Sequence, residues 1–309
     1  MLGALRPQGP FPVLILHGVH GSAKTTTARV LRALVDPNSA PVRSAPRSDR
    51  DLVIAASNAH VLLLDNLSSI APWLSDGLCR LSTGGGFSTR ELFSDTEETI
   101  IDVQRPVLLT GIEELATRAD LMSRTVIVRL PPIDDGARRP EQHFLEDFEE
   151  ARPRLLGALL DALCVGLLVL PQTPTEGYPR MADFARWVTA TEAGLHLPCG
   201  AFLEAYEANR AEANQLTLEA SPISAPLRSL LETTTSWEGT ATELLAALEL
   251  HADDTTRASR GWPAAPTSLS RALLRIRPNL RAAGITISDS RSSRTRLYHL
   301  QRTRVHTET

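Results

Sequence analysis

The chain has 309 residues, of which 42% are hydrophobic and only 5% are aromatic. This composition excludes a disordered protein and predicts two or three domains with mainly aliphatic cores. The net charge of −4 is unevenly divided, because residues 257–309 carry eleven arginines and two acidic residues, which leaves −13 on residues 1–256. We therefore expect an acidic body followed by a basic end that faces nucleic acid.

Signals for metal binding, disulfides and export are weak. Three cysteines lie far apart and eight histidines are scattered, so no disulfide framework or metal-ligand spacing follows. Residues 1–12 lack the apolar core of a signal peptide. The most apolar stretch, Leu155 to Leu170, contains Asp161 and is shorter than the ~20 residues of a membrane span. We expect a cytoplasmic protein without a membrane segment, with a buried helix at 155–170.

The first predicted strand runs directly into a glycine-rich loop. Residues 13–16 are an apolar run typical of a buried parallel strand, and residues 26–34 have a helical pattern. Between them lies Gly-Val-His-Gly-Ser-Ala-Lys-Thr, and this order of strand, loop and helix predicts a phosphate-binding P-loop. Its backbone N–H groups and the helix N-terminus would bind the phosphates. The expected nucleotide contacts are Gly18, Gly21, Ser22, Ala23, Lys24, Thr25 and Thr26.

Two residues of this loop have distinct expected roles. Lys24 would reach the β- and γ-phosphates, and the Thr25 hydroxyl would be a ligand of Mg²⁺. Ala23 stands where the usual pattern has glycine, and its Cβ restricts the backbone near the phosphates. Lys24 is the only lysine of the chain, and a bulky, planar guanidinium cannot replace a compact ammonium there. ATP and Mg²⁺ are the expected cofactors.

Further strands and helices are predicted before residue 139. They are a short helix or turn at 51–58, a strand at 61–65, a helix at 72–81, a β-hairpin with strands 87–93 and 99–103, and strands at 106–111 and 126–130. Asp65 ends the second strand, where a carboxylate can hold Mg²⁺ as a Walker B residue does. Strands that alternate with helices indicate an α/β fold with a parallel sheet.

The second half of the chain is mainly helical. Helices are predicted at 141–151, 154–170, 179–193 and 200–218, then a linker at 221–226, helices at 226–233, 240–250 and 268–283, and strands at 285–288 and 295–300. Three helices followed by a β-hairpin are typical of a winged helix, and Pro278 predicts a kink or break in the third helix. We expect three domains, at 1–139, 140–221 and 222–309.

Arginines near the C-terminus are candidate DNA contacts. The apolar residues that should face the core of the last helix are Leu269, Ala272, Leu273, Ile276 and Leu280. Arg271, Arg275 and Arg277 then face solvent, while Arg291 and Arg294 lie in the wing between residues 288 and 295. These cations suit phosphate contacts without base reading. A solvated arginine-rich surface is the alternative.

With these elements in place, the chain resembles, over nearly its whole length, the ATPase part of phage- and plasmid-type primase-helicases, in the superfamily 3 and AAA+ branch of P-loop ATPases. Residues 18–25 are similar to Walker A, and Leu62–Asp65 to Walker B. The resemblance implies a DNA-contacting hairpin at 87–103 and makes its Arg90 a candidate DNA contact. It also implies a sensor residue at Thr110 and an arginine finger at Arg124, with Arg118 as the competing candidate. The helices after 140 resemble a lid with Arg180 as a second sensor.

Two positions depart from the pattern of that family. Asn66 follows Asp65 where an acidic general base is usual, and Thr110 stands where asparagine is usual. Either Glu91, Glu98 or Glu113 supplies the base, or hydrolysis is slow. No primase domain precedes the loop, so we expect priming on a separate polypeptide or not at all.

The main hypothesis is a Mg²⁺-dependent ATPase that assembles on DNA as a homo-oligomeric ring, for example a hexamer. It would act as a helicase or translocase in the replication of a phage, plasmid or other mobile element. The alternative is an ATP-gated DNA-binding regulator or loader with little hydrolysis, which Asn66 favours. A P-loop kinase for a small substrate would explain neither the basic end nor the separate C-terminal domain.

Overall fold

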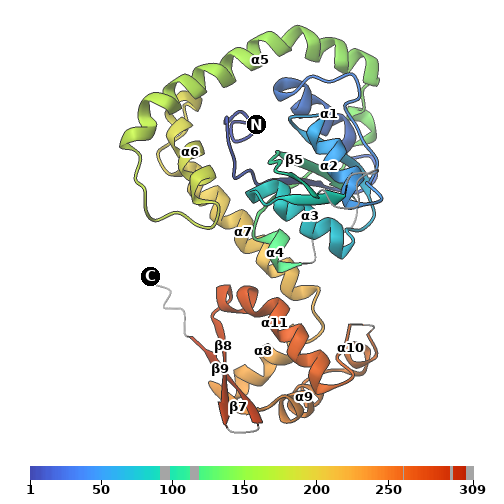
Figure 1. Ribbon diagram of the computed structural model, residues 1–309, viewed down its shortest axis with the longest axis vertical. Coiled ribbons are helices and arrows are strands. Elements are labelled where there is room, and N and C mark those ends of the chain that lie inside the picture. The colour runs from blue at the N-terminus through green and yellow to red at the C-terminus, as the bar shows by residue number, and fades with distance from the viewer. Residues whose placement is uncertain (91–97, 112–117, 260, 293–294, 304–309) are drawn as a thin grey trace. The chain divides into compact units, whose positions relative to one another are not determined.

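The computed structural model describes residues 1–309 except 91–97, 112–117, 260, 293–294 and 304–309, and it leaves the side chains of 87–101 and 291–295 undescribed. The chain divides into two compact units (Figure 1). Unit 1 comprises residues 1–116 and 123–210, and unit 2 comprises residues 117–122 and 211–309. Each unit has its own β-sheet and hydrophobic core.

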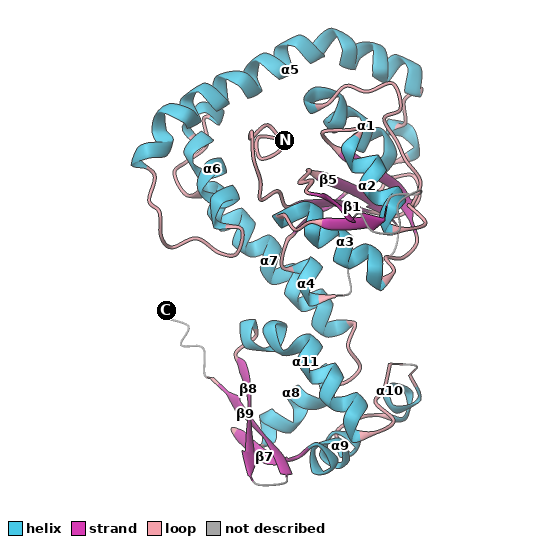
Figure 2. Cartoon of the chain, viewed as in Figure 1, coloured by secondary structure: helices cyan, strands magenta, loops and turns pink. Residues whose placement is uncertain are grey.

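A parallel sheet lies at the centre of unit 1 (Figure 2). Its strands are β1 (Val13–His17), β2 (Leu62–Leu67), β5 (Val107–Gly111) and β6 (Thr125–Arg129), in the order β2-β5-β1-β6. All three pairings are parallel, as predicted, so the carboxyl ends of the strands meet at one edge. The apolar runs of β1, β2 and β5 are buried because helices cover both faces of the sheet.

The outer strands of this sheet are also paired along their other edges. Arg43 forms a parallel bridge with Leu64, and its carbonyl accepts a hydrogen bond from the Asp65 N–H at 3.0 Å. On the opposite side, the Asn209 side chain accepts from the Ile127 N–H at 3.0 Å and donates to the Ile127 carbonyl. These bonds satisfy backbone groups that an open edge would expose.

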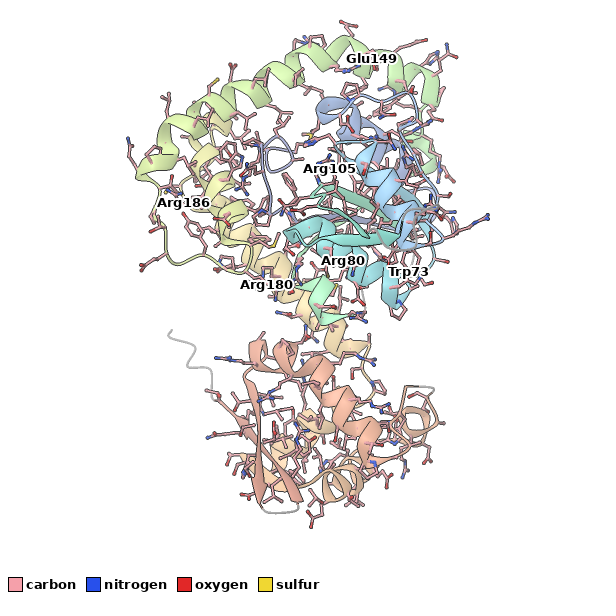
Figure 3. The ribbon with its side chains drawn as sticks, viewed as in Figure 1. Trp73, Arg80, Arg105, Glu149, Arg180 and Arg186 are labelled. Carbon is pink, nitrogen blue, oxygen red and sulfur yellow. The ribbon has the colours of Figure 1, made fainter. Side chains whose placement is uncertain are left out.

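Helices cover both faces of the sheet. α1 (Lys24–Val35) and α3 (Pro72–Thr83) lie on opposite faces (Figure 1). α2 (Asp49–Ser57) packs beside α3, where Arg80 pairs with Asp49 at 3.0 Å (Figure 3). β3 (Phe87–Arg90) and β4 (Glu98–Ile101) form the predicted antiparallel hairpin, and the residues between them lie outside the described part. The α/β prediction for this region is confirmed.

One long helix, α5 (Glu141–Val169), replaces the two helices predicted at 141–151 and 154–170. Pro153 lies inside it and removes one backbone hydrogen bond, at a usual cost of ~3 kcal/mol. Burial of Phe148 on one side of the proline and of Leu159 on the other opposes that cost. The predicted break is therefore wrong.

The expectation of a buried helix at 155–170 is also wrong. Leu167 and Leu168 are 58% and 75% exposed, on the side of α5 away from the buried Leu159 and Ala162. Among the described residues, Glu141–Gln172 is the one helical stretch that is long and apolar enough to cross a membrane, judged by length and composition alone. Its inner side packs against α1 and α6 (Ala182–Thr191) of unit 1.

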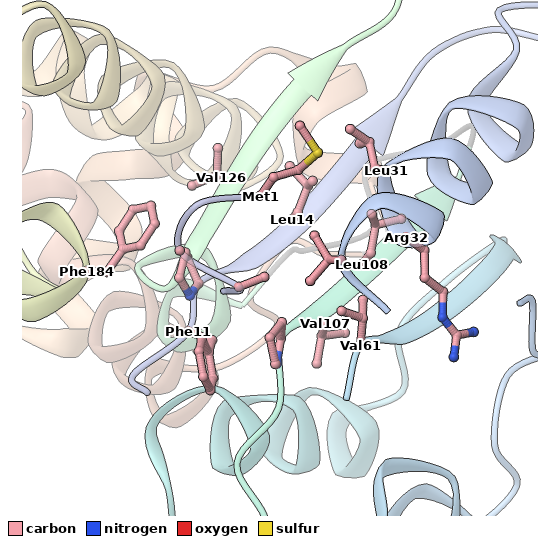
Figure 4. Close-up of a pocket in the computed structure, with 15 residues that line it drawn as sticks. Met1, Phe11, Leu14, Leu31, Arg32, Val61, Val107, Leu108, Val126 and Phe184 are labelled. Atoms are coloured by element: carbon pink, nitrogen blue, oxygen red, sulfur yellow. The ribbon is translucent and has the colours of Figure 1, made fainter. Parts of the chain in front are cut away.

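An apolar cavity of about 140 Å³ lies beside the N-terminal segment of unit 1 (Figure 4). Phe11, Leu14, Leu31, Val107 and Phe184 are among the residues that line it. Leu14 and Val107 come from the first residues of β1 and β5, so the cavity lies near the amino ends of the strands. A cavity with such a lining tends to stay dry, and it is remote from the carboxyl edge of the sheet.

The carboxylate of Glu192 fixes the start of α7 (Ala201–Glu219). Glu192 is 3% exposed and accepts hydrogen bonds from the N–H groups of Gly200 at 2.9 Å and Phe202 at 2.7 Å. The two charge-assisted hydrogen bonds and the positive end of the α7 dipole together stabilise this buried carboxylate. α7 begins in unit 1 and ends in unit 2.

Unit 2 combines short helices with an antiparallel sheet. Its elements are α4 (Ala119–Met122), α8 (Ser224–Thr233), β7 (Ser236–Thr240), α9 (Ala241–Leu250), α10 (Asp254–Ala258), α11 (Pro266–Ala282), β8 (Ile285–Ser292) and β9 (Thr295–Arg302). The sheet order is β7-β9-β8. The sequence patterns missed α4, β7 and α10, because each is short and β7 includes polar residues and Gly239.

α11 is continuous through Pro278, so the predicted break is wrong, while a kink stays a prediction. Ile276 and Leu280, on either side of the proline, are 3% and 0% exposed in the core of unit 2, and this packing holds the helix together. The strands that follow are longer than predicted, so Arg291 lies in β8 and not in a wing loop. Arg294 lies outside the described residues.

Candidate functional site

The glycine-rich loop leaves the carboxyl end of β1 and enters α1 at Lys24. Gly21 and Ala23 have φ angles of +78° and +55°, and turns with left-handed residues direct successive N–H groups toward an anion. Gly18 has no room for a side chain, since an added Cβ would lie 2.7 Å from the Leu130 carbonyl oxygen. α1, all of whose residues are described, has no side-chain cap and no acid in its first turn. Its N-terminus therefore suits an anion.

Lys24 lies at the mouth of this loop. Its Nζ donates to the carbonyl oxygens of Gly18 at 2.7 Å and Val19 at 2.8 Å. The ammonium is therefore held against two carbonyl groups of the glycine-rich loop. Ser22 is 3% exposed and its hydroxyl donates to the Val19 carbonyl at 2.9 Å, which fixes the loop from inside. Thr26, in the first turn of α1, is half-buried.

Three side chains from α1, β2 and β5 form a continuous hydrogen-bonded chain beside Lys24. The Thr25 hydroxyl donates to Asp65 Oδ1 at 2.9 Å, and the Thr110 hydroxyl donates to the same oxygen. Thr110 also accepts from the Asn66 N–H at 2.9 Å. Since Thr110 is only 1% exposed, it fixes the half-buried Asp65 carboxylate next to Thr25. The predicted residues 25, 65 and 110 are thus together.

The Thr25 hydroxyl and the Asp65 carboxylate are oxygen ligands of the kind that Mg²⁺ prefers. This ion commonly takes one or two protein ligands and completes its shell with water and phosphate oxygens. Across the described ranges, no group of three or more His, Cys, Asp or Glu side chains could hold a metal. The residues present therefore fit Mg²⁺ bound together with a phosphorylated ligand.

Asn66, directly after Asp65, adopts a left-handed φ of +56°. Its exposed carboxamide cannot accept a proton from water at neutral pH. Of the three alternatives for the general base, Glu91 and Glu113 lie outside the described residues, and only the backbone of Glu98 is described. The identity of the base stays a prediction.

The candidate arginines of the sensor and finger lie in different surroundings. Arg124 is half-buried, with Nη1 at 3.9 Å from Cys79 Sγ of α3. Arg118 pairs with Asp120 at 3.0 Å. Arg180 is exposed beside α7 (Figure 3), where its carbonyl accepts from the Tyr206 hydroxyl. Their roles stay predictions, as does that of Arg90, whose side chain is not described.

In unit 2, Arg271 and Arg275 are exposed on α11, on the side opposite its core residues. Arg277 instead pairs with Asp289 at 3.5 Å, and Arg296 pairs with the same carboxylate at 3.0 Å. The hydrogen bond to Asp289 raises the pKa of Arg296 above its ordinary value. Asp289 thus neutralises part of the arginine-rich surface, and Arg271 and Arg275 remain the exposed candidates for phosphate contacts.

One neighbour of the glycine-rich loop did not stand out in the sequence. Arg138 follows β6, and its guanidinium is so close to Gly21 that an added Cβ there would lie 2.9 Å from Nη2. The signal that could have identified it is positional, because a residue shortly after a parallel strand lies at the carboxyl edge of the sheet.

Comparison with known proteins assigns the family. Residues 1–217 match the family model for the replication protein of actinomycete integrative conjugative elements. Residues 223–308 match the family model for the C-terminal domain of that replication protein. The chain belongs to this family. It is therefore a replication protein of mobile elements, and a role in DNA replication follows from the family itself.

Other comparisons add little to this family assignment. No curated protein matches the chain. A crystal structure of JCV helicase with a bound acetamide compound is similar at 14% identity and a TM-score of 0.30, over 69% of this chain. The match spans 63% of that helicase chain. At this TM-score the likeness supports no conclusion about the replication protein.

Proposed function

We propose that this replication protein is a Mg²⁺-dependent P-loop ATPase that acts as a helicase or translocase on the DNA of its mobile element. The observation that carries the proposal is the chain from Thr25 through Asp65 to Thr110, beside Lys24 and the glycine-rich loop. It joins the hydroxyl of Thr25, the carboxylate of Asp65 and the hydroxyl of Thr110. The resemblance implies that these residues belong to Walker A, Walker B and the sensor position.

The protein's own residues would position ATP and neutralise charge during phosphoryl transfer. The loop N–H groups and Lys24 hold the β- and γ-phosphates, and Thr25 with Asp65 would hold the ion, which supplies charge neutralisation when bound. Thr110 keeps the carboxylate in position through its buried hydroxyl. Stabilisation of the charge that develops on the transferred phosphoryl group is the main catalytic contribution in this class.

Arg124 is the proposed finger of a homo-oligomeric ring, supplied to the site of a neighbouring subunit. Such fingers contribute roughly 10³ to 10⁵ in rate in the best-studied cases. Co-assembly of Arg124→Ala and Lys24→Ala chains would create some interfaces with both residues intact. Recovery of turnover in these mixed assemblies supports a shared site, and no recovery despite confirmed co-assembly contradicts it.

For unit 2 we propose a winged-helix DNA-binding domain. The order of elements is α8, β7, α9, α10, α11, β8, β9. Apart from the five-residue α10, this order is helix, strand, helix, helix, strand, strand, and α11 would be the helix that meets DNA. Its exposed Arg271 and Arg275 support phosphate contacts, which position a protein on DNA without reading its sequence.

A second candidate function is an ATP-gated DNA-binding regulator or loader, which Asn66 favours because it cannot act as a base. Phosphate release by the full chain, with and without single-stranded DNA, separates the two. The helicase-type proposal predicts Mg²⁺-dependent turnover that DNA stimulates and Lys24→Ala removes. ATP binding that changes DNA affinity without measurable turnover would favour the regulator, and a DNA-independent rate that survives Lys24→Ala would contradict both.

A further inference from the structure

Arg138 reaches the glycine-rich loop from the segment between β6 and α5. Residues 135–137 form a short 3₁₀ turn, and Arg138 follows it. Its Nε donates to Asp135 Oδ1 at 2.9 Å. The terminal nitrogens face the loop, since an added Cβ on Gly21 would lie 2.9 Å from Nη2 and 3.1 Å from Nη1. The guanidinium thus packs directly against the backbone of Gly21.

The partner of Arg138 holds it only weakly. The Asp135 side chain is 98% exposed and that of Arg138 is 52% exposed, and exposed ion pairs of this kind contribute little to stability. A phosphate group in the loop would offer more, because the planar fork of arginine matches phosphate oxygens with two parallel hydrogen bonds. Gly21 also lacks the side chain that would separate the guanidinium from the loop.

We infer that Arg138 binds the phosphates of the nucleotide from within the same subunit, as a second cation beside Lys24. The inference rests on the proposed ATP site and adds a residue that the P-loop pattern does not contain.

Arg139 provides a matched control, because it is the adjacent arginine and has a similar exposed fraction. It is directed to Asp147 of α5 and not to the loop. Binding of a fluorescent ATP analogue to the full chain with Mg²⁺ is measured by competition with ATP and with inorganic tripolyphosphate. The second competitor isolates phosphate contacts from contacts to the base and ribose.

Arg138→Ala is expected to weaken the binding of ATP and of tripolyphosphate by about 10- to 100-fold, the range for a charge-assisted hydrogen bond. Arg139→Ala is expected to bind both within about 2-fold of the wild-type affinity. Unchanged thermal unfolding of Arg138→Ala verifies that it folds. Wild-type affinity in Arg138→Ala, or a loss for ATP but not for tripolyphosphate, would overturn the inference. If Lys24→Ala abolishes binding while Arg138→Ala does not, only this inference fails. If the wild-type chain binds neither competitor, the proposed ATP site fails with it.

Discussion

In the absence of nucleotide, replacement of Ala23 by glycine should stabilise the folded chain. Ala23 has φ +55° and ψ +30°, a left-handed conformation that costs a residue with a Cβ about 1–2 kcal/mol. Glycine removes this cost but adds about 0.4–1 kcal/mol of unfolded-state entropy. The net expectation is a gain of about 0.5–1 kcal/mol, with nucleotide affinity unchanged or slightly improved, because the loop already has the conformation that glycine favours.

Ala158→Gly is a control for which the same substitution should lower the stability of the chain. Ala158 is exposed inside α5, where loss of the same methyl group should destabilise by about 0.5–1 kcal/mol. Urea unfolding by tryptophan fluorescence compares the two, in a Trp237→Phe, Trp262→Phe background that leaves only the tryptophans of unit 1. If Ala23→Gly destabilises as much as Ala158→Gly, the left-handed strain at Ala23 is not real.

Three further perturbations probe the loop, the start of α7 and the basic face of α11. Gly21→Ala should cost about 0.5–1 kcal/mol in urea unfolding, since the strain of a positive φ exceeds the entropy that alanine removes from the unfolded chain, and should weaken ATP binding because a Cβ displaces the Arg138 guanidinium; wild-type values would contradict this. Glu192→Gln should cost about 2–3 kcal/mol through its two backbone donors, whereas Glu149→Gln, in an exposed pair, should cost under about 1 kcal/mol; equal unfolding midpoints would refute the difference. Arg275→Ala should reduce the salt slope of DNA binding by about one unit, while Arg277→Ala, already paired with Asp289, should change it less; equal slopes would count against α11 as the DNA-binding helix.

The sequence predicted the four strands of the parallel sheet, and the glycine-rich loop after the first of them, because their signals are local. An apolar run ending in Asp65 or Thr110 fixes which strand ends carry polar groups, and parallel pairing then brings those ends to one edge. The role of Thr110 as a sensor is implied only by the resemblance to primase-helicases, and the structure places its hydroxyl on the same Asp65 oxygen that Thr25 contacts.

The features that sequence reasoning missed depend on tertiary contacts. Pro153 and Pro278 read as helix breaks, yet packing on both sides keeps α5 and α11 continuous. Arg138 has no motif around it, and only the path of the chain after β6 directs it to Gly21. The exposed Leu168 was expected to be buried because an apolar composition does not show which side of a helix finds a partner.

Calorimetric titration of the full chain with ATP tests the central claim most directly, because Lys24 is the single lysine and donates to two loop carbonyls. The account predicts one ATP bound per chain in the presence of Mg²⁺, weaker binding in EDTA, and loss of the binding heat in Lys24→Ala and also in Lys24→Arg, since a guanidinium cannot replace the compact ammonium. Binding of ATP by Lys24→Ala with wild-type affinity would contradict it.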